Sequence, residues 1–224
     1  FKRQQARWAK GTTQNLLRLL PRLWGNTQLS IAQKVMGTVH LAQYLPQLFL
    51  FIMVLLTPPL ILAGVLEHLP LAPLGLISLL APLMYIISQR RLYPDWKRRL
   101  IAFPVLLAVG SGVMLNNSIA IIAAFLGRPS VFKRTPKFSD KSWQKSRYAL
   151  RPDWTMLFEL VLVIYTIAGG FVALQMMPRL APFLFGQAGG FAVIVAWELF
   201  EELKINFQWQ FTGESTGTHS ERIP

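Results

Sequence analysis

Long uncharged apolar stretches alternate with short, strongly basic segments, and this alternation limits the possible folds more than any other feature of the chain. Of the 23 lysines and arginines, 20 fall in residues 1–34, 89–99 and 128–153. About 20 apolar residues suffice to cross the ~30 Å hydrocarbon core of a bilayer as a helix. Basic residues collect in the cytoplasmic loops of such proteins. We therefore expect an all-α, polytopic helical membrane protein.

The composition supports a membrane protein over a nucleic-acid-binding one. The net charge is +13, but 53% of the residues are hydrophobic and only 15% are charged, which is a membrane profile. The positive charge is segregated between apolar stretches, as cytoplasmic loops require. We expect the lipid bilayer as a partner and no nucleic acid. The predicted location is the cell (cytoplasmic) membrane, multi-pass, with the basic loops and both termini in the cytoplasm.

Four apolar stretches are predicted to cross the membrane completely. They are residues 41–66, 71–88, 155–177 and 180–200. The first should be tilted or kinked at Pro58-Pro59, because proline removes a helical hydrogen bond. The predicted organisation is an N-terminal cytoplasmic interfacial region, a transmembrane region and a polar cytoplasmic tail. These regions are residues 1–34, 35–200 and 201–224.

Residues 100–127 are apolar enough to span, but one crossing would carry the next basic loop outside. The 28 residues are too few for two crossings at some 20 residues each. Gly110-Ser111-Gly112 and Asn116-Asn117 interrupt the run near its centre. Irregular backbone at membrane depth is tolerated where protein or a water-filled cavity covers it. We predict a broken or re-entrant element: a short helix, a hinge, and a second helix along the interface.

Residues 1–34 carry seven basic residues and no acidic one. Leucines cluster beside Arg18 and Arg22, which is typical of an amphipathic helix lying on a membrane surface. Pro21 should break this helix, Gly11 could kink it, and a turn should follow at Gly25-Asn26.

The first motif of interest is Q-x-x-R-W, formed by Gln4, Arg7 and Trp8. The three residues share one face of a helix at spacings of three and four. A guanidinium offers a planar fork for a diphosphate, and an indole offers a flat apolar plate with a polar N–H. The alternative is an interfacial Arg/Trp pair that anchors the helix at lipid headgroups.

A second motif lies in the loop of residues 128–153. It is Val-Phe-Lys-Arg-Thr-Pro-Lys-Phe, with Phe132, Thr135 and Lys137 as its principal residues. A loop of this kind can lay an aromatic ring on a base or sugar while Thr and Lys bind phosphate oxygens. The alternative is a polybasic juxtamembrane loop that binds anionic lipid.

Together the two motifs resemble the membrane half of processive family 2 glycosyltransferases, the cellulose, hyaluronan and glucomannan synthase-like enzymes. Their pattern is an interfacial helix with Q-x-x-R-W and a cytosolic gating loop with F-x-V-T-x-K. This chain fills the first motif completely and the second except for Arg134, which stands where cellulose synthases carry Val. The resemblance covers residue 1 to about residue 200.

The resemblance implies a role for each motif residue. Trp8 would stack on the terminal sugar of the glycan acceptor, and Gln4 and Arg7 would lie near the nucleotide diphosphate. The gating loop would close over the nucleotide sugar, with Thr135 and Lys137 toward the diphosphate. Phe132 would pack against the nucleotide sugar, and the spans would line the path of the polymer.

The catalytic apparatus of this family is a cytosolic domain that precedes Q-x-x-R-W. It holds a divalent metal, Mg or Mn, and an Asp general base. No D-x-D motif occurs in this chain, and Asp95, Asp140 and Asp153 are isolated. We therefore expect a catalytic domain in cis before Phe1 and no catalytic or metal site within these residues. Alone, the segment should be inactive.

Two other classes stay open. A transporter or channel would need paired intramembrane charges or matching broken helices in two halves. A membrane-anchoring subunit would use its basic loops to bind lipid only. Glu159 lies inside an apolar run, where a carboxylate is costly unless it faces a cavity or a partner. It could line a channel or reach the cytoplasmic interface toward Arg151.

Overall fold

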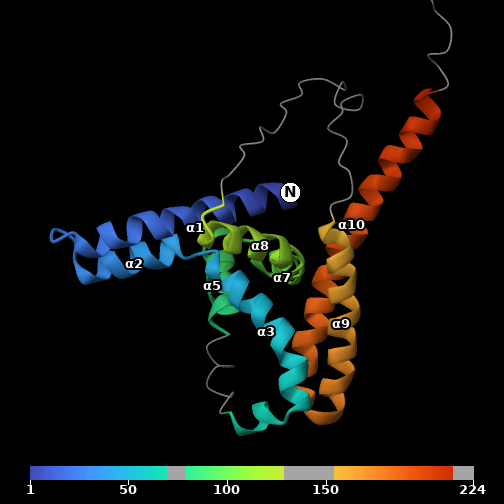
Figure 1. Ribbon diagram of the computed structural model, residues 1–224, viewed down its shortest axis with the longest axis horizontal. Coiled ribbons are helices and arrows are strands. Elements are labelled where there is room, and N and C mark those ends of the chain that lie inside the picture. The colour runs from blue at the N-terminus through green and yellow to red at the C-terminus, as the bar shows by residue number, and fades with distance from the viewer. Residues whose placement is uncertain (70–78, 129–153, 214–224) are drawn as a thin grey trace, which may run out of the picture.

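The computed structural model describes residues 1–69, 79–128 and 154–213, and beyond Phe200 it describes only one side chain, that of Leu203. This part of the chain is helical and contains no strand (Figure 1). The α-helices are α1 (Lys2–Gly25), α2 (Ile31–Leu41), α3 (Leu45–Leu62), α5 (Leu80–Leu92), α6 (Trp96–Arg99), α7 (Ala102–Gly112), α8 (Met114–Phe125), α9 (Thr155–Met176) and α10 (Ala181–Gly213). Two short 3-10 helices are η1 (Val65–His68) and η3 (Pro178–Leu180). The all-helical prediction is confirmed for these residues.

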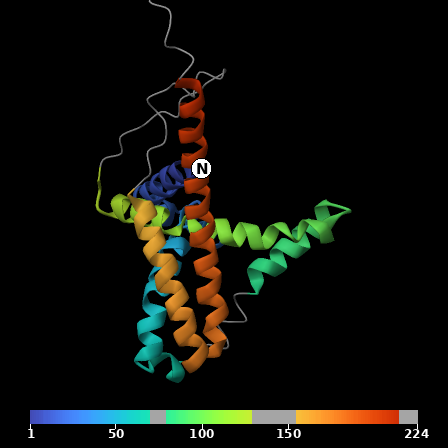
Figure 2. The same cartoon turned by 90° about the vertical axis from the view of Figure 1, so that its right-hand side faces the viewer.

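Helices α3, α9 and α10 run side by side and form the central bundle (Figures 1 and 2). Two apolar clusters hold it together. The cluster near η1 comprises Ile61, Leu66, Ala173, Met177, Ala181 and Leu184. The cluster beneath α8 comprises Val54, Met114, Leu115, Leu162 and Phe191. Many apolar side chains on the outside of these helices are exposed, as expected of helices that face lipid.

Three described segments are long and apolar enough to cross a membrane: Leu45–Leu62, Thr155–Met176 and Pro178–Phe200. The first two fall within the predicted spans 41–66 and 155–177, and the third begins two residues before the predicted span 180–200. The remaining predicted span, 71–88, is not among these candidates. Residues 70–78 lie outside the description, and the described part of the span lies largely in α5, a helix of 13 residues. A fourth candidate exists if the bent pair α7–α8 counts as one span.

The broken element predicted over 100–127 is confirmed as a bend between two helices. Trp96–Gly112 and Met114–Phe125 meet at 48°. Gly112 lies directly before the break, where α7 crosses α10. A Cβ atom at Gly112 would lie 2.5 Å from the carbonyl oxygen of Gly190, so only glycine allows this approach of the two backbones.

Helices α1 and α2 form a hairpin that lies crosswise to the central bundle, with α1 over α8 (Figure 1). The turn predicted at Gly25-Asn26 is confirmed, since α1 ends at Gly25. The predicted break at Pro21 is wrong, because α1 continues through it and through Gly11. A proline removes one backbone hydrogen bond, and packing against α8 and α2 outweighs that loss.

A second helix, α2, begins after the predicted turn and within the region 1–34. Ser30 caps it: the Ser30 hydroxyl accepts from the backbone amide of Gln33, and the Gln33 side chain accepts from the backbone amide of Ser30. The C-terminal region differs from expectation. In the segment predicted as a polar tail, 201–224, α10 continues to Gly213. The remaining residues, 214–224, lie outside the description.

Candidate functional site

The Q-x-x-R-W motif lies on the first three turns of α1. The opposite face of the helix carries Ala9, Thr13 and Leu16, all of which are buried. Helix α1 packs on α8, so these buried positions identify the inward face. At 100° per residue, Gln4 and Trp8 lie on the other half of the helix.

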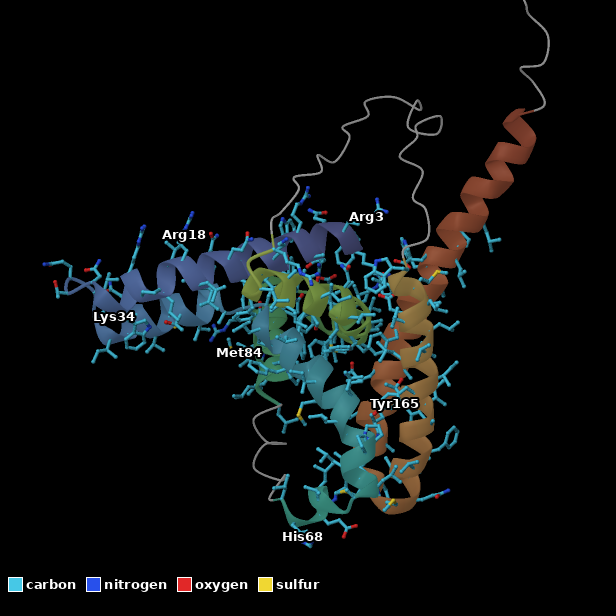
Figure 3. All side chains as sticks on the ribbon, in the orientation of Figure 1. Arg3, Arg18, Lys34, His68, Met84 and Tyr165 are labelled. Carbon is cyan, nitrogen blue, oxygen red and sulfur yellow. The ribbon has the colours of Figure 1, made fainter. Side chains whose placement is uncertain are left out.

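The exposure of the motif residues agrees with this geometry. Gln4 is exposed, Trp8 is 49% exposed and Arg7 is half-buried. Figure 3 shows Arg3 and Arg18 on the side of α1 that is turned away from α3, α9 and α10. The structure therefore brings an amide, a guanidinium and an indole to an accessible helix face at one end of the bundle.

The gating-loop residues Phe132, Thr135 and Lys137 lie outside the described residues. Their predicted approach to Gln4 and Arg7 stays a prediction.

A charged junction, which we define as Lys2, Thr155, Glu159 and Glu198, lies beside the start of the motif helix. The ammonium nitrogen of Lys2 lies 2.8 Å from Oε1 and 2.9 Å from Oε2 of Glu159. It also lies 2.9 Å from Oε1 of Glu198 and 2.8 Å from the hydroxyl oxygen of Thr155. Three helices, α1, α9 and α10, therefore meet through one ammonium group.

Burial makes this junction energetically important. The Glu159 side chain is fully buried, and the Lys2 side chain is only 12% exposed. A buried carboxylate is strongly unfavourable without a charged or hydrogen-bonding partner. Lys2 supplies that partner from a position 157 residues away in sequence.

Helix α8 adds two asparagines to the same region. The Asn116 side-chain amide donates to the backbone carbonyl of Lys2 at 2.8 Å. The fully buried Asn117 donates to the side-chain oxygen of Gln47 on α3. The asparagine pair thus ties α8 to α1 on one side and to α3 on the other.

The junction revises the interpretation of two acidic residues. Glu159 is bound by Lys2, whereas the predicted neighbour Arg151 lies outside the described residues. Glu198 lies within α10 and accepts a hydrogen bond from Lys2, so it belongs to the junction and is not only a charge near the end of an apolar segment.

Sequence reasoning did not identify Lys2 or Thr155 as members of a site. A signal was present for both. Lys2 lies 7 residues before Ala9 and therefore on the same, inward helix face. Thr155 and Glu159 are spaced four apart and face the same direction.

In residues 1–69, 79–128 and 154–213, no group of three or more His, Asp or Glu side chains could hold a metal ion. No family model, curated protein or solved structure matches this chain. The function is therefore argued from the residues and geometry given above.

Proposed function

We propose that this chain is the membrane-embedded part of a family 2 glycosyltransferase, which transfers sugar from a nucleotide sugar to a growing polysaccharide. It would bind the acceptor, gate the nucleotide sugar and form the path of the product across the membrane. The transfer itself would be carried out by a catalytic domain on the same polypeptide, which would also hold the Mg or Mn ion.

One observation carries this proposal: the presentation of Gln4, Arg7 and Trp8 on the accessible face of α1. Because α1 lies crosswise at one end of the bundle and packs on α8 through its opposite face, this face is open to ligands that approach that end from outside the bundle. An exposed indole can stack on the apolar face of a sugar ring. A guanidinium two turns from the helix start can bind phosphate oxygens in a bidentate manner.

Within this proposal the motif residues divide between two ligands. Trp8 binds the terminal sugar of the acceptor, and Gln4 and Arg7 bind the nucleotide diphosphate. Thr135 and Lys137 of the gating loop contact the same diphosphate, and Phe132 packs on the nucleotide sugar.

The position of the basic helix supports a cytoplasmic location for this end of the bundle. Arg3 and Arg18 both lie on the outer side of α1 (Figure 3). Cytoplasmic segments are rich in such residues, and nucleotide sugars are cytoplasmic substrates. In this orientation α1 lies along the inner membrane surface of the cell.

The buried pair of Lys2 and Glu159 favours a second candidate, a transporter, because ionisable residues inside a membrane often mark ion or substrate pathways. Transporter sites lie near the bilayer midplane. Glu159 is the fifth residue of α9, and Glu198 lies near the end of the apolar segment Pro178–Phe200. The charged junction is thus at the end of the spans, which favours the glycosyltransferase.

The test uses membranes from cells that express this chain together with the coding sequence preceding Phe1. Transfer from radiolabelled nucleotide sugars to polymer is measured for the parent and for Arg7→Ala. The matched control is Arg18→Ala, which removes the same charge from an exposed position on the same helix. We expect Arg7→Ala to raise KM for the nucleotide sugar about tenfold or more, as loss of one charge-assisted contact would. Equal KM values in the two variants would contradict the proposal, and substrate accumulation without transfer would favour a transporter.

A further inference from the structure

We propose that Lys2 is a positioning residue that latches the start of α1 to the start of α9 and the middle of α10. The latch fixes where the Q-x-x-R-W face lies relative to the spans. The role of Lys2 in fixing the position of α1 does not depend on the proposed function, whereas its effect on acceptor binding rests on that function.

The contacts of Lys2 are complete. An ammonium group has three donors, and the acceptors Thr155, Glu159 and Glu198 lie within 2.9 Å of its nitrogen. The backbone carbonyl of Lys2 accepts from Asn116. One residue is therefore bonded to α8, α9 and α10 at once.

The Lys2 side chain joins the first turn of α1 directly to both long helices. The far end of α1 is held by α2, where the Trp24 indole donates to Thr38 and the Lys34 ammonium donates to the Trp24 carbonyl. The middle is held by apolar packing on α8. The start is held to α9 and α10 by Lys2, and Gln4 follows Lys2 by only two residues.

The charge balance makes the latch specific for a cation. Two carboxylates converge on one ammonium, and Glu159 is fully buried. Replacing Lys2 by an uncharged residue would leave two acidic groups close together in a dry environment, where like charges repel strongly. We infer that α9 and α10 would then separate near Glu159 and Glu198 or admit water there, and that the start of α1 would detach.

The test measures the position of α1 by electron-spin distance measurements in lipid nanodiscs. The chain has no cysteine, so two introduced cysteines carry the only nitroxide labels. Suitable positions are Arg3 at the start of α1 and the exposed Leu174 on α9. Leu174 lies about 22 Å along the helix from Glu159, within the working range of the method.

Four variants are compared in this labelled background. Lys2→Ala removes the latch, and the double variant Lys2→Glu with Glu159→Lys exchanges the charges. Glu198→Gln removes one negative charge but keeps an accepting oxygen, at a side chain that is partly exposed, and is therefore the mildest change. Arg18→Ala is the control.

The parent and the control should give one narrow distance distribution. Lys2→Ala should broaden it, Glu198→Gln should broaden it less, and the charge exchange should restore it. A distribution in Lys2→Ala as narrow as in the parent would overturn the latch. If Lys2→Ala does not insert in the membrane, an unchanged distribution in Glu198→Gln would overturn it equally.

Polymer synthesis by the longer polypeptide separates this inference from the proposed function. With the latch broken, we expect KM for an oligosaccharide acceptor to rise about tenfold while kcat changes less, because the binding face is misplaced rather than removed. The charge-exchanged variant should recover most of the loss. A parent that transfers no sugar would refute the proposed function and leave the distance result as the test of the latch.

Discussion

The hydroxyl of Tyr165 on α9 donates a hydrogen bond to the backbone carbonyl of Leu55 on α3. This carbonyl is the one that Pro59, four residues later, leaves without its helical donor. Hydrocarbon offers no replacement for such a bond. Tyr165 therefore compensates the proline in α3 and joins two candidate spans.

We expect Tyr165→Phe to lower the free energy of unfolding by about 0.5–1.5 kcal/mol, because it leaves the Leu55 carbonyl without a donor. Thermal unfolding in a mild detergent measures the change. Tyr93→Phe is the control, since the hydroxyl it removes lies on the exposed loop before α6, while the ring that stacks under Arg99 is kept. Equal midpoints of thermal unfolding for the two variants would show that another group donates a hydrogen bond to the Leu55 carbonyl.

The crossing of α7 and α10 gives a second prediction. Gly112→Ala would place a Cβ atom 2.5 Å from the Gly190 carbonyl oxygen, and overpacking of this kind costs about 1–3 kcal/mol. Gly110→Ala on the same helix is the matched control, because a Cβ atom there meets nothing within 4 Å. Its stability should stay equal or rise slightly through better helix propensity. A Gly112→Ala variant as stable as Gly110→Ala would mean that the two helices are not in close contact.

The exposed pair of Asp95 and Arg99 gives a prediction on pH. A hydrogen bond from Arg99 lowers the pKa of Asp95 below its ordinary value of 3.8. Because the pKa of Asp95 is lowered in the folded state, the pair stabilises the fold at pH values above the ordinary pKa. This stabilisation is lost as the pH falls through the folded-state pKa. Between pH 5 and pH 8 the contribution of the pair to the stability of the fold should not change.

Carbon-detected NMR of the Asp95 carboxyl in nanodiscs checks this sign. The midpoint should lie below 3.8 in the parent and return toward it in Arg99→Gln. A midpoint above 3.8 in the parent would contradict the pairing.

The sequence predicted the apolar helices well because their signal is local. Three predicted spans coincide with described helices, and the bend after Gly112 lies where small and polar residues interrupt an apolar run. The break predicted at Pro21 was wrong because tertiary packing overrode a local propensity. The continuation of α10 to Gly213 was missed because polar residues after an apolar span suggest a tail whether or not the helix continues.

The candidate site was predictable only in part. The shared face of Gln4, Arg7 and Trp8 follows from helical spacing alone. The contact between Glu159 and Lys2 could not be predicted from spacing, because Lys2 is one of many lysines and lies in a distant segment. Intramembrane charge signals that a partner exists, and only the placement of Lys2 beside α9 and α10 identifies it.

In the proposed function, the accessible face of α1 binds the glycan acceptor through Trp8. The most direct measurement compares polymer synthesis by Trp8→Ala and Trp24→Ala in the longer polypeptide, at matched membrane insertion. Both indoles are 49% exposed on the same helix, but Trp24 is occupied with Thr38 at the far end. We predict loss of elongation, by about tenfold or more for one stacked sugar, in Trp8→Ala alone. Unchanged synthesis in Trp8→Ala, or an equal loss in both variants, would contradict the account.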